Sequence, residues 1–186
     1  GTGTDNLDLE YMRKKNIALF TTPDAPVQAV AELTIGSLMI LMRKINKMSN
    51  DLKMGIWKKR IGSELQFKTV LIVGFGRIGQ RVAKILKAFD CKILFYDPYF
   101  DDRLNNSNDY KKVDLEEGIK QADIISLHVS GNKEILKERH FDLMKRGVFL
   151  LNPSRGELIN ENILKKYLDN EIVGGVWLDT FEQEPY

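Results

Sequence analysis

The chain has 186 residues, which at roughly 150 residues per domain is enough for one full domain and part of another. Hydrophobic residues make up 43% and charged residues 29%, so the chain can bury an ordinary core, and disordered and fibrous classes are excluded. The 28 basic and 26 acidic residues leave a formal net charge of +2, and this balance gives no support for a nucleic-acid or membrane partner.

The first 25 residues are expected to be the tail of another domain. Residues 1–6 have the composition of a loop, a short helix is expected around Leu9 to Lys15, and a short strand over Ile17 to Phe20. The amino terminus has neither an initiator methionine nor the basic-then-apolar pattern of a signal peptide. We therefore expect the chain to be cut from a longer protein.

A long apolar helix is expected next, from Val27 to Ile45, with Pro26 suited to its first turn. Its middle, Leu38 to Met42, is apolar on every side and must be covered all round. Two interpretations stay open: packing in the core of this chain, and packing against a second copy in a dimer. The longest uncharged apolar stretch, Leu33 to Met42, has ten residues, whereas a membrane span needs about 18, so a transmembrane helix is excluded.

After a polar connector that carries Trp57 and Gly62, strand-like and helix-like segments alternate to the end of the chain. The strand-like segments are β-branched and almost uninterrupted by polar residues, which is typical of a parallel sheet buried on both faces. The sequence therefore predicts an α/β fold, a Rossmann-type doubly wound parallel sheet with helices on both faces. The expected strands are Thr69 to Val73, Lys92 to Tyr96, Ile124 to Val129, Val148 to Leu151 and Ile172 to Leu178, and the expected helices are Arg77 to Phe89, Leu115 to Gln121, Phe141 to Met144 and Glu161 to Leu168.

A glycine-rich turn, residues 74–79, lies between the first of these strands and the first helix, which is the context of a dinucleotide-binding fingerprint. Gly74 permits the tight turn, Gly76 lets the backbone approach a pyrophosphate, and Gly79 allows close packing of helix on strand. Backbone amides near Arg77 and Ile78, at the positive end of the helix dipole, would hold the phosphates.

Asp97 ends the next expected strand, 18 residues after Gly79 and close to the spacing of about 20 expected for a ribose-binding acid. A carboxylate there accepts hydrogen bonds from the adenosine ribose and repels a 2′-phosphate, so NAD is favoured over NADP. The alternative is an aspartate that only ends a strand ahead of Pro98 in a turn. The order of strand, turn, helix, strand and acid favours the cofactor interpretation.

Two polar clusters follow later strands at the carboxyl edge of the expected sheet, where ligands of doubly wound sheets bind. One cluster is Asn152 to Gly156, which contains Arg155, and the other is Asp179 to Pro185. The alternative for Arg155 is an ordinary surface arginine in a turn.

In their order along the chain, these motifs resemble the D-isomer-specific 2-hydroxyacid dehydrogenases, and most closely the D-3-phosphoglycerate dehydrogenase-like members. The resemblance covers essentially the whole chain. It implies that residues 1–25 are the C-terminal remnant of a substrate (lid) domain and that residues 26–186 are an NAD-binding Rossmann domain, truncated before the family's catalytic histidine. The matching stretches are Gly1-x-Gly3-x-Asp5-Asn6, Ala29 to Leu33, the glycine turn with Asp97, Leu127-His128, Asn152 to Gly156 and Asp179-x-Phe181-x-x-Glu184-Pro185.

The resemblance also implies roles for individual residues. Arg155 would bind the substrate carboxylate and polarise the reacting carbonyl, because a guanidinium can grip a 2-keto acid with two hydrogen bonds. Glu184 would orient the catalytic histidine and stabilise its protonated form. Cofactor contacts are implied at Gly74, Gly76, Arg77, Ile78, Gly79, Asp97, His128, Val129, Ser154 and Asp179, and the backbone at Thr2 and Gly3 would bind the substrate carboxylate.

Neither histidine of the chain is expected to replace the catalytic one. His128 follows an apolar run, where a hydrogen-bonded structural imidazole is favoured over a chemical role, and His140 lies in a charged stretch and is expected to be exposed. Because hydride transfer to a keto acid needs a proton donor, the chain alone is expected to bind cofactor and turn over little or nothing. Near the nicotinamide the chain departs from the family pattern, with Asn160 in place of an aspartate and residues 130–132 in place of Pro-Leu-Thr.

The sequence thus predicts the cofactor domain of an NAD-dependent oxidoreductase, which transfers hydride reversibly between the nicotinamide and C2 of a small 2-hydroxy or 2-keto acid. The alternative is a non-catalytic NAD(H)-sensing interaction module of the corepressor type. The apolar helix and the resemblance both favour a homodimer through the NAD-binding domain. Cys91 has no second cysteine to pair with, and with two histidines it makes a poor set of soft metal ligands, so we expect no metal and a reducing cytoplasm.

Overall fold

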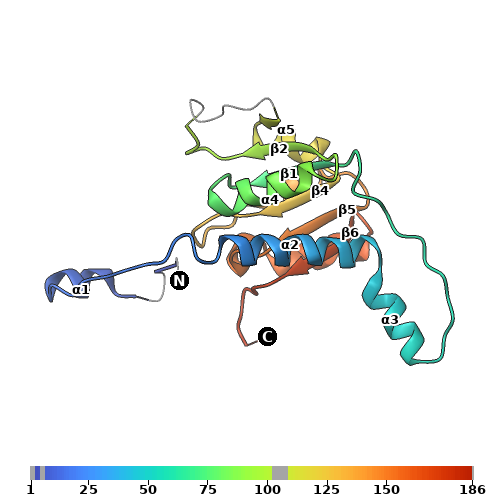
Figure 1. The fold of residues 1–186 in the computed structure, drawn as a ribbon, viewed down its shortest axis with the longest axis horizontal. Coiled ribbons are helices and arrows are strands. Elements are labelled where there is room, and N and C mark those ends of the chain that lie inside the picture. The colour runs from blue at the N-terminus through green and yellow to red at the C-terminus, as the bar shows by residue number, and fades with distance from the viewer. Residues whose placement is uncertain (1–2, 5–6, 102–108, 186) are drawn as a thin grey trace.

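The computed structural model describes residues 3–4, 7–101 and 109–185, and its centre is a six-stranded parallel sheet (Figure 1). The strand order is β3-β2-β1-β4-β5-β6, which is the order of the doubly wound dinucleotide-binding fold. The predicted fold class is therefore confirmed. The strands are β1 (Thr69–Val73), β2 (Lys92–Tyr96), β3 (Tyr110–Lys112), β4 (Ile124–Leu127), β5 (Val148–Asn152) and β6 (Val173–Leu178).

The middle of the sheet is the point where the strand order reverses. Strand β1 lies between β2 and β4, and the register aligns Val73 with Tyr96 on one side and with Leu127 on the other. The loops after these three residues therefore begin side by side at the carboxyl edge of the sheet. In doubly wound folds this switch point is where ligands bind.

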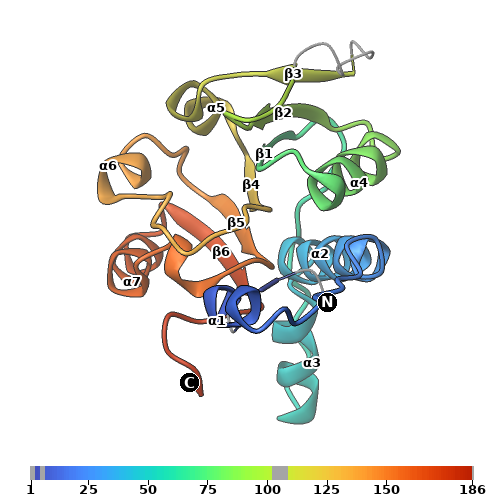
Figure 2. The same cartoon turned by 90° about the vertical axis from the view of Figure 1, so that its left-hand side faces the viewer.

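Helices cover both faces of the sheet, α2 and α4 on one face and α5, α6 and α7 on the other (Figure 2). Along β1, Val70 and Ile72 pack toward the first pair of helices, whereas Leu71 and Val73 pack toward the second group. All four side chains are fully buried, which explains why the strands carry so few polar residues. The helices are α1 (Leu9–Lys14), α2 (Val27–Met42), α3 (Ile45–Lys53), α4 (Arg77–Lys87), α5 (Leu115–Gln121), α6 (Glu138–Phe141) and α7 (Glu161–Asp169), with a short 3-10 helix η2 (Gly156–Leu158).

The segment before α2 lies outside the sheet and its cores. Helix α1 buries none of its residues and reaches away from the body of the molecule in Figure 1. The predicted strand over Ile17 to Phe20 is wrong, because this segment pairs with no described strand and its backbone is irregular. Phe20 is 90% exposed, so the apolar side chain that suggested a buried strand packs in no core of the described chain.

The predicted helix from Val27 to Ile45 is two helices. Helix α2 ends at Met42, Lys44 takes a left-handed conformation with φ +55°, and α3 then leaves in a new direction (Figure 1). No glycine or proline marks this break, so it could not be predicted from local sequence, and most of α3 was expected to belong to the polar connector. Leu38 and Met42 are almost fully buried against the sheet, which confirms core packing for that face of α2.

Two further predictions are corrected. Helix α6 spans Glu138–Phe141 instead of the predicted Phe141 to Met144, so it begins and ends three residues earlier; Glu138 and Arg139 face solvent, whereas His140 and Phe141 are buried. His140 is therefore only 4% exposed, whereas an exposed side chain was expected. Strand β3 was not predicted, since its three residues show no apolar pattern. The other element boundaries differ from the predicted ones by at most two residues.

None of the described helices combines the length and the hydropathy of a membrane span.

Candidate functional site

The turn after β1 requires glycine at its first position. Gly74 has φ +90°, which side chains rarely adopt, and a Cβ atom there would lie 2.5 Å from the backbone oxygen of His128. The two loops that leave β1 and β4 are joined further by the His128 N–H, which donates to the Val73 carbonyl at 2.7 Å. The glycine turn and the start of the β4 loop are therefore one compact unit.

The other two glycines of the turn differ in what surrounds them. Gly76 is the N-cap of α4, and a Cβ atom on it would meet nothing within 4 Å. Gly79 is buried in the first turn of α4, and a Cβ atom on it would lie 2.2 Å from the Gly74 oxygen. Gly79 thus allows the helix to approach the turn, whereas the space in front of Gly76 is left open for a ligand.

Asp97, at the end of β2, is tied to the glycine turn. One carboxylate oxygen accepts the Phe75 N–H at 2.8 Å, and the other accepts the Tyr99 N–H at 2.9 Å. Each oxygen keeps further lone pairs with which to accept hydroxyl groups. Asp97 lines a cavity of about 460 Å³ at the switch point, together with Val73, Gly74, Gly76, Tyr96, Pro98, Tyr99, residues 128–135 and Leu158.

A second cavity, of about 370 Å³, adjoins the first, because His128, Val129, Ser130 and Gly131 line both. Its far wall is formed by the loop after β5, including Arg155. Several residues that were predicted separately for the cofactor and for the substrate meet in this cavity. Its lining consists of Gly3, Thr4, Pro26, Val30, Ile78, Pro153, Ser154 and Arg155, in addition to the four shared residues.

His128 holds its ring by a hydrogen bond between its Nε2 and the hydroxyl of Ser126, at 2.8 Å. Burial lowers the pKa of His128 to about 3, so the imidazole is neutral at ordinary pH. A neutral ring of this kind can orient a ligand by hydrogen bonding, but it is a poor proton donor. The geometry agrees with the structural interpretation that the sequence favoured.

The loop that carries Arg155 is closed by a residue to which the sequence analysis gave no role of its own. The Asn152 carboxamide accepts the Ser154 N–H at 3.1 Å and donates to the Arg155 carbonyl at 2.7 Å. The backbone carbonyl of Asn152 also accepts the Asp179 N–H at 3.0 Å, and this bond joins the ends of β5 and β6. Asn152 is only 1% exposed, and a buried asparagine needs hydrogen-bond partners, but no local pattern in the sequence indicates which ones.

The structure does not bring every predicted site residue to these cavities. Asp179 and Glu184 lie on the loop after β6 and line neither cavity, and the Glu184 carboxylate accepts the Phe181 N–H at 3.0 Å. The Arg77 side chain points to Asp24, with 2.9 Å between Nε and the carboxylate, and also lies outside both linings. Thr2 lies outside the described residues.

Asn160 has a local task that accounts for one departure from the family pattern. It is the N-cap of α7, and its side-chain oxygen accepts the N–H groups of Asn162 and Ile163 at 3.0 and 3.1 Å. Asparagine and aspartate serve equally well at this position of a helix. Asn160 lines neither of the two cavities described above, so its capping role accounts for the asparagine without a cofactor contact.

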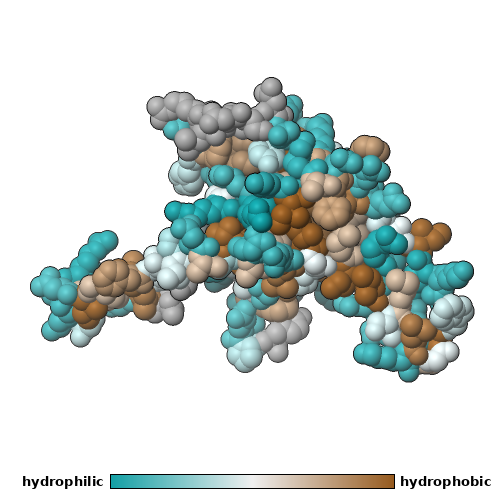
Figure 3. All heavy atoms as spheres, in the orientation of Figure 1, coloured by the Kyte–Doolittle hydropathy of each residue, from teal (hydrophilic) through white to brown (hydrophobic). Residues whose placement is uncertain are grey.

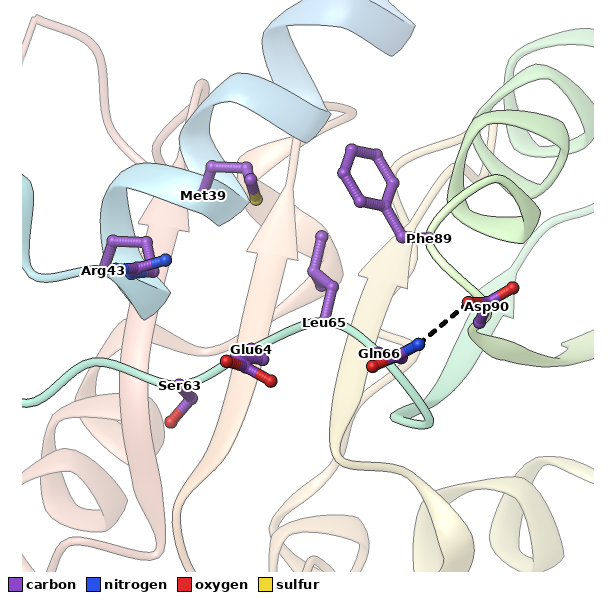
Figure 4. A pocket seen from close by; sticks show the side chains of 8 residues that line it. All are labelled: Met39, Arg43, Ser63, Glu64, Leu65, Gln66, Phe89 and Asp90. Atoms are coloured by element: carbon purple, nitrogen blue, oxygen red, sulfur yellow. Dashed lines mark hydrogen bonds between the residues drawn. The ribbon is translucent and has the colours of Figure 1, made fainter.

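A third cavity, of about 400 Å³, lies away from the first two, where α2 and α4 end (Figure 4). It shares no lining residue with them, and Leu65 and Asp90 place it at the amino-terminal edge of the sheet, before β1 and β2. Gln66 donates to the Asp90 carboxylate across one side of it, at 3.0 Å. The remaining lining residues are Met39, Arg43, Ser63, Glu64 and Phe89.

Comparison with known proteins agrees with this geometry. Residues 35–186 match the family model described as "D-isomer specific 2-hydroxyacid dehydrogenase, NAD binding domain". The D-3-phosphoglycerate dehydrogenase of Methanocaldococcus jannaschii is 39% identical to the chain over 191 residues, which are 100% of this chain and 36% of that protein.

Solved structures of the same kind superpose on the chain over nearly all of its length. The structure of D-2-hydroxyisocaproate dehydrogenase matches with a TM-score of 0.93 at 35% identity, over 100% of this chain and 57% of that one. The D-lactate dehydrogenase of Aquifex aeolicus, complexed with NAD and lactic acid, matches with a TM-score of 0.88 at 31% identity, over 98% of this chain and 56% of that one. The chain thus spans less than two thirds of the length of each of these three relatives.

Proposed function

Because the chain belongs to the D-isomer-specific 2-hydroxyacid dehydrogenase family and forms its NAD-binding domain, we propose that the full-length protein interconverts small D-2-hydroxy acids and 2-keto acids. The observation that carries this proposal is the pair of adjoining cavities. One cavity contains the open face of Gly76 and the Asp97 carboxylate, the other contains Arg155, and four residues of the β4 loop line both. A dinucleotide laid along them would reach from the acid to the arginine.

The residues of the first cavity fit NAD. The free space at Gly76 admits a diphosphate against the backbone amides of Arg77 and Ile78, in the first turn of α4, where the helix dipole is positive. Asp97 would accept the adenosine ribose hydroxyls, while Gly74 and Gly79 keep the turn tight. NAD, when bound, supplies the hydride acceptor or donor for the reaction.

The residues of the second cavity fit a 2-keto acid beside the nicotinamide. Arg155 would bind the substrate carboxylate and polarise the C2 carbonyl, and Gly3 lines the same cavity. His128, Val129 and Ser154 would line the nicotinamide ribose. Thr2, although outside the described residues, is assigned to the same carboxylate-binding loop by the family resemblance.

The loop after β6 would complete the site with groups that approach from outside the cavities. Glu184 would orient the catalytic histidine of the full-length protein, and Asp179 would face the nicotinamide end of the cofactor.

Residues 1–25 would belong to the substrate domain and residues 26–186 to the cofactor domain. The exposed, core-free course of α1 supports that division. Three relatives of this chain are named for three different acids, so the substrate would be selected largely by the other domain.

The test is an assay of the full-length protein with NADH and a panel of 2-keto acids. Arg155→Lys and Arg155→Ala should lose most of the turnover while NADH binding stays within about twofold of wild type, because the arginine contacts substrate and not cofactor. Arg146→Ala is the matched control, since Arg146 pairs with Glu171 at an exposed place outside both cavities. Unchanged kinetics in Arg155→Ala would exclude the residue from the site. NADH binding without turnover of any keto acid would favour the sensing module.

We also propose that the protein is a homodimer through this domain. The support is an arm formed by residues 45–62, which comprises α3 and the connector after it and projects from the body (Figure 1). Hydrophobic side chains gather on the arm (Figure 3), among them Met54, Trp57 and Ile61, which are 67, 80 and 90% exposed. Large apolar side chains that are exposed together on one segment are typical of an interaction site. A partner's arm would also cover the third cavity, at the base of the arm.

The dimer is tested by analytical ultracentrifugation of the full-length protein and of its Trp57→Ser, Ile61→Ser double variant. Wild type should sediment as a dimer and the double variant as a monomer with unchanged far-UV circular dichroism. A monomeric wild type at high concentration would contradict the proposal.

We propose a reducing, cytoplasmic location because Cys91 is a buried free thiol. Cys91 is 2% exposed and forms no disulfide, its thiol donates to the Leu65 carbonyl at 3.2 Å, and burial raises the pKa of Cys91 to about 11. Such a thiol behaves as a small apolar side chain.

A further inference from the structure

The loop that carries Glu184 is fastened to the first turn of α7 by a reciprocal pair of hydrogen bonds. The Glu182 N–H donates to the Glu161 carboxylate at 2.7 Å, and the Glu161 N–H faces the Glu182 carboxylate at 3.4 Å. The first distance is that of a good charge-assisted hydrogen bond, whereas the second is long and weak. The Glu161 carboxylate is therefore the main fastening, which we call the clamp.

The Glu161 carboxylate lies at the amino-terminal end of α7. Glu161 is the first residue of α7, directly after the N-cap Asn160. The N-terminus of a helix carries a partial positive charge from its unpaired N–H groups, which stabilises a carboxylate in the first turn.

A second contact joins the same loop to the residue after Arg155. A Cβ atom on Gly156 would lie 2.0 Å from the carbonyl carbon and oxygen of Phe181, so the two backbones touch with no room for a side chain. The Phe181 N–H in turn donates to the Glu184 carboxylate at 3.0 Å. Direct contacts thus lead from Gly156, next to Arg155, through Phe181 to Glu184, and the clamp holds Glu182, the residue that follows Phe181.

We propose that Glu161 is a positioning residue that, through the Glu182 amide, fixes the Glu184 carboxylate relative to Arg155. This inference rests on the proposed function, in which Arg155 holds the keto acid and Glu184 orients the proton donor. A displacement of about 1 Å between such groups costs turnover without weakening ligand binding in proportion. Loss of the clamp therefore lowers kcat and leaves the KM for keto acid and the Kd for NADH nearly unchanged.

The experiment compares Glu161→Ala and Glu161→Gln in the full-length protein, with Glu157→Ala as the matched control on the exposed surface of η2. Glu161→Ala removes the acceptor of the Glu182 N–H and should lower kcat about tenfold, the equivalent of ~1.4 kcal/mol, with KM and Kd within about twofold of wild type. Glu161→Gln keeps an acceptor oxygen at the same place and should recover most of that loss. Glu157→Ala should behave as wild type.

A measurement of amide hydrogen exchange checks the clamp without reference to activity. The Glu182 amide should exchange faster in Glu161→Ala than in wild type and should be protected again in Glu161→Gln. The inference is overturned if Glu161→Ala has wild-type kcat, if Gln does not rescue it, if KM rises instead of kcat falling, or if the exchange is unchanged. Absence of turnover in the wild type would overturn the proposed function, and the inference with it.

Discussion

A Cβ atom placed on Gly79 would lie 2.2 Å from the carbonyl oxygen of Gly74, so the first turn of α4 rests directly on the turn that precedes it. The neighbouring Gly76 has open space instead. The two glycines of one motif thus have different roles. Gly79 allows close packing within the protein, whereas Gly76 leaves space for a ligand.

This contrast predicts different consequences for the same substitution. Gly76→Ala should fold with wild-type stability, because nothing lies within 4 Å of the new methyl group, but should weaken NADH binding by about 100-fold or more, since the methyl occupies the diphosphate position. Gly79→Ala should lower the free energy of unfolding by about 1–3 kcal/mol through overpacking. Thermal unfolding and calorimetric titration with NADH measure the two effects.

Gly36→Ala is the control for both glycine variants, because Gly36 lies within α2 with nothing within 4 Å of its Cβ position. The variant should bind NADH as wild type does and should gain up to about 1 kcal/mol of stability from the better helix former. Wild-type NADH affinity in Gly76→Ala would contradict the assignment of the diphosphate site.

Asn152→Ala should destabilise the loop that carries Arg155. The substitution leaves the Ser154 N–H and the Arg155 carbonyl without their partner, and we expect a loss of about 1–3 kcal/mol in the free energy of unfolding. The KM for keto acid should rise more than the Kd for NADH, because the loop positions Arg155. Steady-state kinetics and urea unfolding of the full-length protein check both expectations.

Asn152→Asp sharpens this prediction, because aspartate keeps the acceptor for Ser154 but cannot donate to the Arg155 carbonyl and adds a buried charge. It should therefore be no better than Asn152→Ala. Asn162→Ala, on the exposed side of α7, is the control and should leave both quantities unchanged. A wild-type KM in Asn152→Ala would show that the carboxamide does not position Arg155.

Much of this fold could be predicted because local patterns and tertiary packing agree. The apolar strands, the glycine turn and Asp97 each have a signal within a few residues, and the five strands with such patterns lie where they were expected. The break at Lys44 and strand β3 have no such signal, since packing alone decides them. Ile17 to Phe20 shows the converse error, because an apolar pattern forms no strand where no partner strand lies alongside.

The candidate site could be predicted only where a residue acts through its own type. Asp97 is recognisable from its spacing after the glycine turn, and Arg155 is recognisable only because the motif around it resembles that of the family. Asn152 and Glu161 act through backbone groups brought together from distant parts of the chain, and only the tertiary structure reveals such contacts.

Asp97→Asn should shift the preference between cofactors. The carboxylate faces the space expected for the adenosine ribose, so removal of its charge should weaken NADH binding about tenfold and relieve repulsion of the 2′-phosphate of NADPH. Asp97→Ala should weaken NADH binding further, because the Phe75 and Tyr99 N–H groups also lose their acceptor. Fluorescence titration with both cofactors gives the ratio of the two dissociation constants.

The control is Asp90→Asn, since Asp90 lies at the opposite edge of the sheet and bonds to Gln66. This variant should keep the wild-type ratio. A wild-type protein that prefers NADPH, or an unchanged ratio in Asp97→Asn, would remove the role proposed for Asp97.

The lowered pKa values of the two histidines predict loss of stability in mild acid. Burial lowers the pKa of His128 from its usual 6.5 to about 3 and lowers the pKa of His140 in the same direction. Between these values the unfolded chain binds protons that the folded chain does not, so the free energy of unfolding falls as pH decreases below about 6.5, by at most ~1.4 kcal/mol per pH unit for each histidine. The lowered pKa values of Asp51 and Asp123 act in the same direction only near and below 3.8, so measurements between pH 5 and 6.5 isolate the histidines.

Urea unfolding at several pH values measures how steeply the free energy of unfolding depends on pH. This slope should be smaller in His128→Gln, whose amide can still bond to Ser126, and smaller again when His140→Gln is added. Equal stability at pH 5 and pH 7 in the wild type would mean that neither ring is held neutral by the fold.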